Sequence, residues 1–265
     1  MPFFCCFVKR FFLEYISMEN IKALLIDCDG VLYDKSGCTG DDIVQVGLKK
    51  TLEQYHISWD DFEQVRTDLK TTEIRGLFNA IFDICTKRHI ELDTFTNAIV
   101  ANTDYSRISK DSEMLSLLQQ AANIVPTCIV TNNTLPHLIK IFDRLRGKTS
   151  PKNLSEELNL HIIAIENTLA FDIDHQRAIF HPKQMKNQFK KICAQLDLPP
   201  EQVALIDDTE RIRKKASEQG LVTIEINGPA DTKAFLTQFL TEKTNEKQRT
   251  KRHFPVRKAR SRTGN

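Results

Sequence analysis

Short runs of apolar residues recur along the chain, each bounded by polar residues. Because the apolar side chains in these runs are consecutive rather than alternate, the runs are typical of strands buried on both faces of a parallel sheet. Five runs have this pattern: Lys22–Asp27, Val125–Thr131, Leu160–Glu166, Val203–Asp207 and Leu221–Ile226. We therefore expect at least five parallel strands.

Between most of these runs, apolar residues return every three to four positions, as on the buried face of an amphipathic helix. Five stretches have this period: Ser112–Asn123, Leu135–Arg146, Gln184–Leu196, Thr209–Gln219 and Asp231–Leu240. Strands that alternate with helices predict an α/β fold with a doubly wound, Rossmann-like parallel sheet.

One interval, residues 37–109, departs from this alternation. It contains four stretches with a helical period: Asp41–His56, Asp60–Lys70, Glu73–Lys87 and Leu92–Ala101. The interval is too long for a simple crossover, so it predicts an α-helical cap inserted after the first strand, above the edge where open α/β sheets bind ligands. Residues 21–36 and 110–240 would then form the core domain.

The two ends of the chain differ from this body. Residues 1–20 are rich in aromatic side chains, and Met18 begins a cleaner apolar pattern. We interpret this segment as a leader or a mis-set start; a weak membrane-surface anchor, acylated at Cys5 or Cys6, is the alternative. Residues 241–265 carry nine Lys or Arg and two Glu. They predict a disordered basic tail, which either binds nucleic acid or an acidic surface or serves only solubility.

Composition narrows the class of protein. The 265 residues are 41% hydrophobic and 27% charged, with a formal net charge of +2, which is typical of a globular protein. The seven cysteines form no C-x-x-C pair. A disulfide framework and a structural zinc site are therefore not expected, and a reducing, cytoplasmic setting is the simplest interpretation. No apolar run approaches the roughly 20 residues that span a bilayer.

Polar residues follow three of the predicted strands at their carboxyl ends. They are Asp27 and Asp29 after the first strand, Thr131, Asn132 and Asn133 after the second, and Asp207 and Asp208 after the fourth. Parallel strands bring these ends to one edge, where four carboxylates would repel one another unless a cation lay between them. Oxygen-only ligands favour Mg²⁺. Each Asp could instead be a helix cap or a turn residue, but that explanation weakens when three strand ends share the feature.

The segment Leu25–Asp34, LIDCDGVLYD, resembles the first motif of the haloacid dehalogenase-like (HAD) phosphohydrolase superfamily, an apolar strand followed by D-x-D-x-[TV]-L. Thr131 matches the second motif of that superfamily, Lys183 the third, and Asp207-Asp208 the fourth, in the family's order. The resemblance covers most of the chain and implies the HAD fold together with Mg²⁺-dependent phosphatase chemistry.

The resemblance also implies a role for each motif residue. Asp27 would attack phosphorus and form an aspartyl-phosphate, while Asp29 would act as general acid and then as general base. Thr131 would hold the phosphoryl oxygens, and Lys183 would add positive charge beside Asp27. Lys183 could alternatively be a solvated lysine at a helix start. The implied metal site consists of Asp27, Asp29 through its backbone carbonyl, Asp207 and Asp208.

A finer resemblance is to the pyrimidine 5′-nucleotidase-type branch, whose members have a small helical cap. It is carried by Leu32–Asp34, Ile74–Leu77 and Tyr105. The chain departs from that branch at two positions. Asn133 stands where the branch usually has Ala or Gly, and Gln184 follows Lys183 where the branch usually has Pro. The substrate-binding residues expected from this resemblance are Asn132, Asn133 and Arg75. Arg75 could also be an ordinary surface arginine.

The predicted function is therefore hydrolysis of a small phosphorylated metabolite, with a nucleoside 5′-monophosphate as one candidate. Two alternatives stay open. One is phosphoryl transfer of the phosphosugar mutase type. The other is a non-catalytic protein that binds a partner through its basic tail. The sequence gives no indication of oligomeric state.

Overall fold

The computed structural model describes residues 18–35, 43–71, 77–149, 153–172, 177–180, 182–183 and 187–253. At its centre is a five-stranded parallel sheet with the strand order β3-β2-β1-β6-β7. The strands are β1 (Ala23–Ile26), β2 (Thr127–Val130), β3 (His161–Ile163), β6 (Val203–Asp207) and β7 (Val222–Glu225). The predicted doubly wound parallel sheet is confirmed, and each strand lies within one of the five apolar runs.

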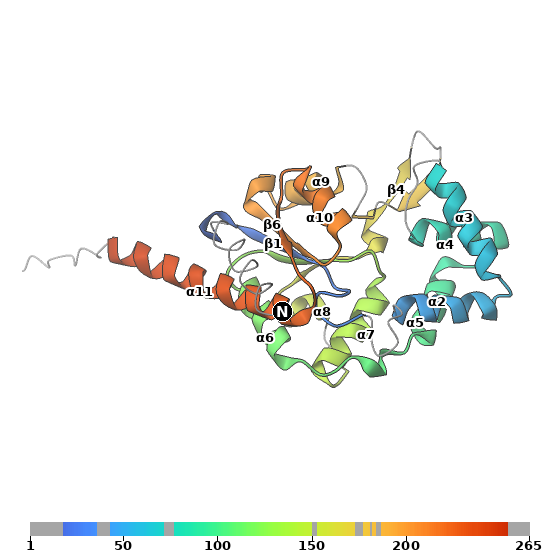
Figure 1. The fold of residues 1–265 in the computed structure, drawn as a ribbon, viewed down its shortest axis with the longest axis horizontal. Helices are drawn as coiled ribbons and strands as arrows, with labels where there is room; N and C mark the ends of the chain where they lie inside the picture. The colour runs from blue at the N-terminus through green and yellow to red at the C-terminus, as the bar shows by residue number, and fades with distance from the viewer. Residues whose placement is uncertain are drawn as a thin grey trace, which may run out of the picture.

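Helices cover both faces of this sheet (Figure 1). Alternate residues of β1 point to opposite faces: Leu24 and Ile26 join one apolar core, while Ala23 and Leu25 join the other. The first core also contains side chains of α6 (Ser112–Ala122), α7 (Leu135–Arg146), α8 (Leu154–Leu158) and α11 (Pro229–His253). The second contains side chains of α9 (Gln188–Gln195) and α10 (Glu210–Ser217). Burial on both faces explains why β1 is apolar at every position.

Four further helices lie between β1 and α6 in the sequence. They are α2 (Ile43–Gln54), α3 (Trp59–Thr71), α4 (Leu77–Arg88) and α5 (Leu92–Asn102). Figure 1 shows them grouped beside the sheet, on the side away from the projecting end of α11. They occupy the interval predicted as a cap. The helix expected to start at Glu73 begins in the described residues at Leu77, because residues 72–76 lie outside that part of the chain.

A two-stranded antiparallel sheet was not predicted. It consists of β4 (Leu169–Asp172) and β5 (Arg177–Phe180), and it pairs Leu169 with Phe180 and Asp172 with Arg177. The Phe180 ring packs edge-on against Phe78 and Phe82 of α4. The strands are only four residues long, and what they pack against comes from a distant part of the chain, so no local period revealed them.

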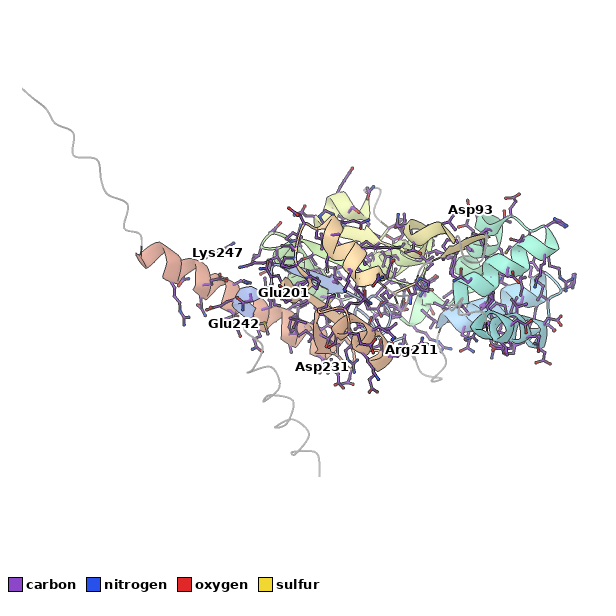
Figure 2. The ribbon with its side chains drawn as sticks, turned by 90° about the horizontal axis from the view of Figure 1, so that it is seen from above. Asp93, Glu201, Arg211, Asp231, Glu242 and Lys247 are labelled. Carbon is purple, nitrogen blue, oxygen red and sulfur yellow. The ribbon has the colours of Figure 1, made fainter. Side chains whose placement is uncertain are left out.

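The prediction of a disordered tail from residue 241 is wrong for residues 241–253, which continue α11. Lys243 is buried, and its Nζ donates to the backbone oxygen of Glu19 at 2.9 Å and pairs with Glu246 at 3.1 Å. These contacts join α11 to η1 (Met18–Asn20) and support a helix whose residues have adequate helix propensity. Figure 2 shows Glu242 and Lys247 on the part of α11 that extends past the body.

The remaining short helices are η3 (Tyr105–Arg107), η4 (Ile165–Thr168) and η5 (Pro200–Gln202). Residues 1–17 and 254–265, which include most of the leader and the end of the basic tail, lie outside the described residues. Within the described ranges, no helix has both the length and the apolar character needed to cross a membrane.

Candidate active site

Asp27 lies where β1 ends, at the centre of the sheet. Its backbone N–H donates to the carbonyl of Ile206 at 2.9 Å, so the ladder with β6 extends to this residue. Its carboxylate accepts from the N–H of Cys28 at 2.8 Å, and the residue is 7% exposed. The chain then turns at Gly30, whose φ is +81°. A Cβ at Gly30 would lie 2.4 Å from Oδ2 of Asp208, so only glycine lets that carboxylate approach the loop.

Three carboxylates from two neighbouring strands meet at this edge. One oxygen from each of Asp27, Asp207 and Asp208 lies within 4.8 Å of the others. Asp207 is fully buried and accepts from the N–H of Thr209 at 2.9 Å. Asp208 accepts from the hydroxyl of Thr209 at 3.1 Å and from Lys35 Nζ at 2.6 Å. The predicted convergence of these three acids at one edge is therefore present.

Lys183 supplies the positive charge inside this group. Its Nζ lies 2.7 Å from a carboxylate oxygen of Asp27 and 2.7 Å from one of Asp207, and the residue is 4% exposed. Burial alone would lower the pKa of Lys183, but the two carboxylates outweigh that effect and raise this pKa above its usual range. Lys183 is therefore a buried ammonium and not a solvated lysine. Its backbone N–H donates to Oδ1 of Asn132 at 2.9 Å.

The protonation of Asp27 depends on this surrounding charge. Burial raises the pKa of Asp27 to about 7; Lys183 opposes that rise, while repulsion from Asp207 and Asp29 adds to it. At neutral pH this carboxyl group is therefore only partly ionised when protein charges alone surround it. A nucleophilic carboxylate would need a further positive charge nearby.

Asp29 has a different environment from Asp27, although only Cys28 separates them. Its Oδ2 accepts from the side-chain amide of Asn133 at 2.7 Å and from the hydroxyl of Thr131 at 3.3 Å. Its Oδ1 faces Nε2 of His137 at 3.0 Å and accepts from the hydroxyl of Tyr33. Burial alone would raise the pKa of Asp29, but His137, Tyr33 and Asn133 together hold it well below its usual value.

The sequence interpretation missed the role of His137. This residue lies in the first turn of α7, whose N-cap Thr134 accepts from the His137 N–H at 3.3 Å. The ring is buried, and its Nδ1 lies 2.8 Å from the hydroxyl of Tyr105. Two hydrogen bonds therefore fix the imidazole against Asp29. A polar residue on the apolar face of a helix, four positions after Asn133 of the strand-end motif, was the available signal.

The predicted site residues have separate positions in the structure. Thr131 lies beside Asp29, and its Oγ1 also accepts from the backbone N–H of Asn133 at 3.0 Å. Asn132 holds the backbone of Lys183, whereas Asn133 contacts Asp29. Arg75 lies outside the described residues. Lys35, which the sequence interpretation did not single out, forms the ion pair with Asp208 described above.

The residues around Asp27 fit a hard divalent cation. Asp27, Asp207 and Asp208 offer only oxygen atoms, which suits Mg²⁺ better than a soft transition metal. The absence of a Cβ at Gly30 keeps the approach of Asp208 open. The Asp29 carboxylate is engaged elsewhere, so any contribution from this residue would come from its backbone carbonyl, as the resemblance implies.

An apolar cavity lies between the inserted helices and the Asp29 side of the site. Aliphatic and aromatic side chains form most of its wall, among them Leu48 of α2, Phe78 and Ile81 of α4, and Ile99 of α5. Asn133 and His137, both hydrogen-bonded to Asp29, complete the lining together with Thr96 and Thr134. None of the described residues that line this cavity is a lysine or an arginine.

Comparison with known proteins supports this assignment of the fold. A family model described as haloacid dehalogenase-like hydrolase matches residues 21–212. The structure of CbbY from Rhodobacter sphaeroides in complex with phosphate is similar, with 17% identity, a TM-score of 0.50, and coverage of 78% of this chain and 87% of that chain. A CbbY mutant in complex with xylulose-1,5-bisphosphate has 16% identity, a TM-score of 0.51 and the same coverage. At such identity these structures support the fold alone. No curated protein matches the chain.

Proposed function

The chain belongs to the haloacid dehalogenase-like hydrolase family, and we propose that it hydrolyses a small phosphate monoester through a phosphorylated Asp27. Members of this family are typically Mg²⁺-dependent phosphatases with an aspartate nucleophile. The observation that carries the proposal is the position of Lys183, which lies 2.7 Å from both Asp27 and Asp207 in a buried site. Such a charge is placed to neutralise both the nucleophile and an arriving phosphate dianion.

In the first step, a carboxylate oxygen of Asp27 attacks phosphorus while the bond from phosphorus to the ester oxygen breaks. Asp29 must carry a proton for this step, and the negative charge of the arriving phosphate would raise its pKa above the lowered value of the substrate-free protein; Asp29 then donates this proton to the ester oxygen, so that the alcohol leaves neutral. Lys183 balances the charge on Asp27 and on the transferring phosphoryl group, and the Thr131 hydroxyl contacts the phosphoryl oxygens. A Mg²⁺ ion held by Asp27, Asp207, Asp208 and the Asp29 carbonyl would supply further charge neutralisation.

In the second step, water attacks the phosphorus of the aspartyl-phosphate and restores Asp27. Asp29 accepts the proton of this water, and the hydrogen bonds from His137, Asn133 and Tyr33 keep Asp29 in the ionised form that this step requires. The products are inorganic phosphate and the alcohol. Asp29 has given and regained one proton over the cycle.

The leaving group must lie against Asp29, the residue that protonates it. The small apolar cavity next to Asn133 and His137, about 20 Å³, holds little more than a water molecule and does not itself define the substrate. Nucleoside 5′-monophosphates are the first candidates because Leu32–Asp34 and Tyr105 resemble the pyrimidine 5′-nucleotidase-type branch. In this proposal Arg75, Asn132 and Asn133 contribute to substrate binding.

The experiment is hydrolysis of p-nitrophenyl phosphate with and without added Mg²⁺. The wild-type protein should release phosphate only with the ion, and Asp27→Asn should lower kcat by at least about 10³-fold. Asp197→Asn, at an exposed position remote from the site, is the matched control and should keep wild-type activity. Equal trace rates in the wild type and Asp27→Asn would contradict the proposal.

A panel of phosphate esters then tests the substrate class. Nucleoside 5′-monophosphates should have a higher kcat/KM than sugar bisphosphates. Conversion of a sugar phosphate to its isomer without phosphate release would instead establish the mutase alternative.

A further inference from the structure

The buried side chain of Asn79 links the hairpin β4–β5 to α4 through two hydrogen bonds. Asn79 of α4 donates from Nδ2 to the carbonyl of Phe180 at 3.0 Å, and its Oδ1 accepts from the N–H of Phe180 at 2.8 Å. Asn79 is fully buried and Phe180 is 2% exposed. One amide thus satisfies both backbone groups on the outer edge of β5, where a further strand would otherwise pair.

This pair of hydrogen bonds fixes the position of Phe180 relative to α4, which apolar packing alone would not do. The rings of Phe78 and Phe82 contact the Phe180 ring edge-on, with centroids 5.3 and 5.6 Å apart. Aromatic contacts of this kind tolerate small shifts, whereas two hydrogen bonds to one residue fix both distance and direction. A buried amide that lost them would carry a large desolvation cost. Asn79 therefore determines where Phe180 lies relative to α4.

Phe180 is only three residues before Lys183, so its position constrains the lysine. Three residues span at most about 10 Å, and Pro182 within the link has a fixed φ. At the far end, the Lys183 N–H is bound by Asn132 at 2.9 Å. The segment is thus held by α4 at one end and by the loop after β2 at the other. Because the link is short, we expect a displacement of Phe180 together with α4 to disturb the Lys183 backbone or its bond to Asn132.

We propose that Asn79 is a positioning residue for the reaction: by holding Phe180 to α4, it keeps Lys183 Nζ between Asp27 and Asp207. The inference rests on the proposed phosphatase function and extends it to a residue outside the four motifs. It makes the charge on the nucleophile depend on the position of the inserted helices. Those helices also line the small apolar cavity beside Asn133 and His137.

The test is a double-mutant cycle on kcat for p-nitrophenyl phosphate with Mg²⁺. Asn79→Ala should lower kcat by about tenfold in the wild type, with KM changed by less than about threefold, because a displaced group loses catalytic effect more than binding. In the Lys183→Ala background, the same substitution should change kcat by less than about twofold. An unchanged kcat, or an equal loss in both backgrounds, would overturn the inference.

Phe82→Leu is the matched control variant. It removes an aromatic contact to the same Phe180 ring from the same helix, but it keeps both bonds of Asn79. Its kcat should stay within about threefold of the wild type. A loss equal to that of Asn79→Ala would mean that any loosening of α4 has this effect, and would also overturn the inference. If Asn79→Ala does not fold, Asn79→Ser, which is polar but too short to bond both groups, is tested in the same cycle.

Hydrogen exchange separates this inference from the proposed function, because it needs no activity. Asn79→Ala should speed exchange of the Lys183 amide by about tenfold or more, and Phe82→Leu should not. If this change occurs in a protein without Mg²⁺-dependent hydrolysis, the proposed function fails and the link between Asn79 and Lys183 stands. If the wild type is active and Asn79→Ala alters neither exchange nor kcat, the inference fails and the proposed function stands.

Discussion

The environments of Asp27 and Asp29 shift the pKa values of these two carboxyl groups in opposite directions. On one side, Asp27 lies among other acids, and burial raises its pKa to about 7 despite the ion pair with Lys183. On the other side, the Asp29 side chain is nearly as enclosed, 15% exposed against 10% for Asp27, but hydrogen-bond donors surround it and hold its pKa below the usual value. The difference shows that what a buried carboxylate faces, and not burial itself, decides its charge.

This contrast suits two different tasks. A group that accepts a phosphoryl needs an oxygen that can reach phosphorus and must be sensitive to added positive charge. The contacts of Asp27 with Cys28 and Lys183 both fall on its Oδ1. A group that moves a proton must be held in one orientation, as Asp29 is by His137 and Asn133. Environments that separate the pKa values of two neighbouring carboxyl groups commonly mark separate chemical roles.

Removal of the carboxylate on the Asp29 side should have the largest effect. Asp29→Asn should slow phosphoenzyme formation from an alkyl phosphate by about 10³-fold, because an alkoxide cannot leave without a proton. With p-nitrophenyl phosphate the loss in this step should be about tenfold or less, because nitrophenolate leaves unprotonated. Single-turnover rapid quench measures both rates. Equal losses for the two esters would mean that Asp29 is not the general acid. A group on the Asp27 side of the site would then have to supply the proton to the leaving group.

The raised pKa of Asp27 should have a measurable effect on the free energy of unfolding. The folded-state pKa of about 7 lies above the unfolded value of 3.8, so the folded protein increasingly loses stability as pH rises from about 4 to 7. Without divalent ions, Asp27→Asn should therefore raise the free energy of unfolding at pH 7.5 by on the order of 3 kcal/mol, and much less at pH 4. Urea denaturation at both pH values measures this. A variant that is less stable than the wild type at pH 7.5 would contradict the electrostatic account.

His137 provides the opposite test on the Asp29 side. The folded-state pKa of Asp29 is lowered, so its contribution to stability is present above the unfolded value of 3.8 and is lost as pH falls below it. His137→Ala should lower the free energy of unfolding by about 2 kcal/mol at pH 7, and the difference should narrow at pH 3. His137→Gln, which can still donate toward Asp29, should recover part of the loss. A pH-independent difference would indicate a packing defect only.

The smallest expected effect tests whether Asp208 is a ligand of the metal ion. Gly30→Ala places a Cβ where Asp208 Oδ2 lies and forces a side chain into a left-handed conformation. Titration calorimetry with Mg²⁺ should show an affinity about tenfold weaker than the wild type, since one ligand is displaced. Gly220→Ala, at another positive φ but away from the site, is the control for backbone strain. Unchanged affinity in Gly30→Ala would remove Asp208 from the metal site.

The cluster of acids at the carboxyl edge of the sheet could be predicted because it follows from local sequence patterns. Asp27 and Asp207 each follow an apolar run, and parallel pairing then brings their ends together without further information. The partners of Asp29 could not be predicted in this way. His137 reaches Asp29 only because α7 starts at a particular angle after β2, and Lys35 reaches Asp208 across a loop.

The hairpin and the tail show two further limits. The strands β4 and β5 are stabilised by each other and by α4, where Asn79 lies 101 residues before its partner Phe180. The polar segment 241–253 looked unstructured because it has no apolar period, yet Lys243 fixes it to Glu19 at the other end of the chain. Local patterns miss elements whose support comes from distant residues.

The central claim is that Asp27 carries the phosphoryl group, and mass spectrometry of the acid-quenched enzyme tests it most directly. After brief mixing with p-nitrophenyl phosphate and Mg²⁺, the peptide that contains Asp27 should gain the mass of one phosphoryl group on that residue. The adduct should be absent in Asp27→Asn and should accumulate when Asp29→Asn slows its hydrolysis. Turnover with no adduct in either the wild type or Asp29→Asn, or an adduct on another residue, would contradict the account.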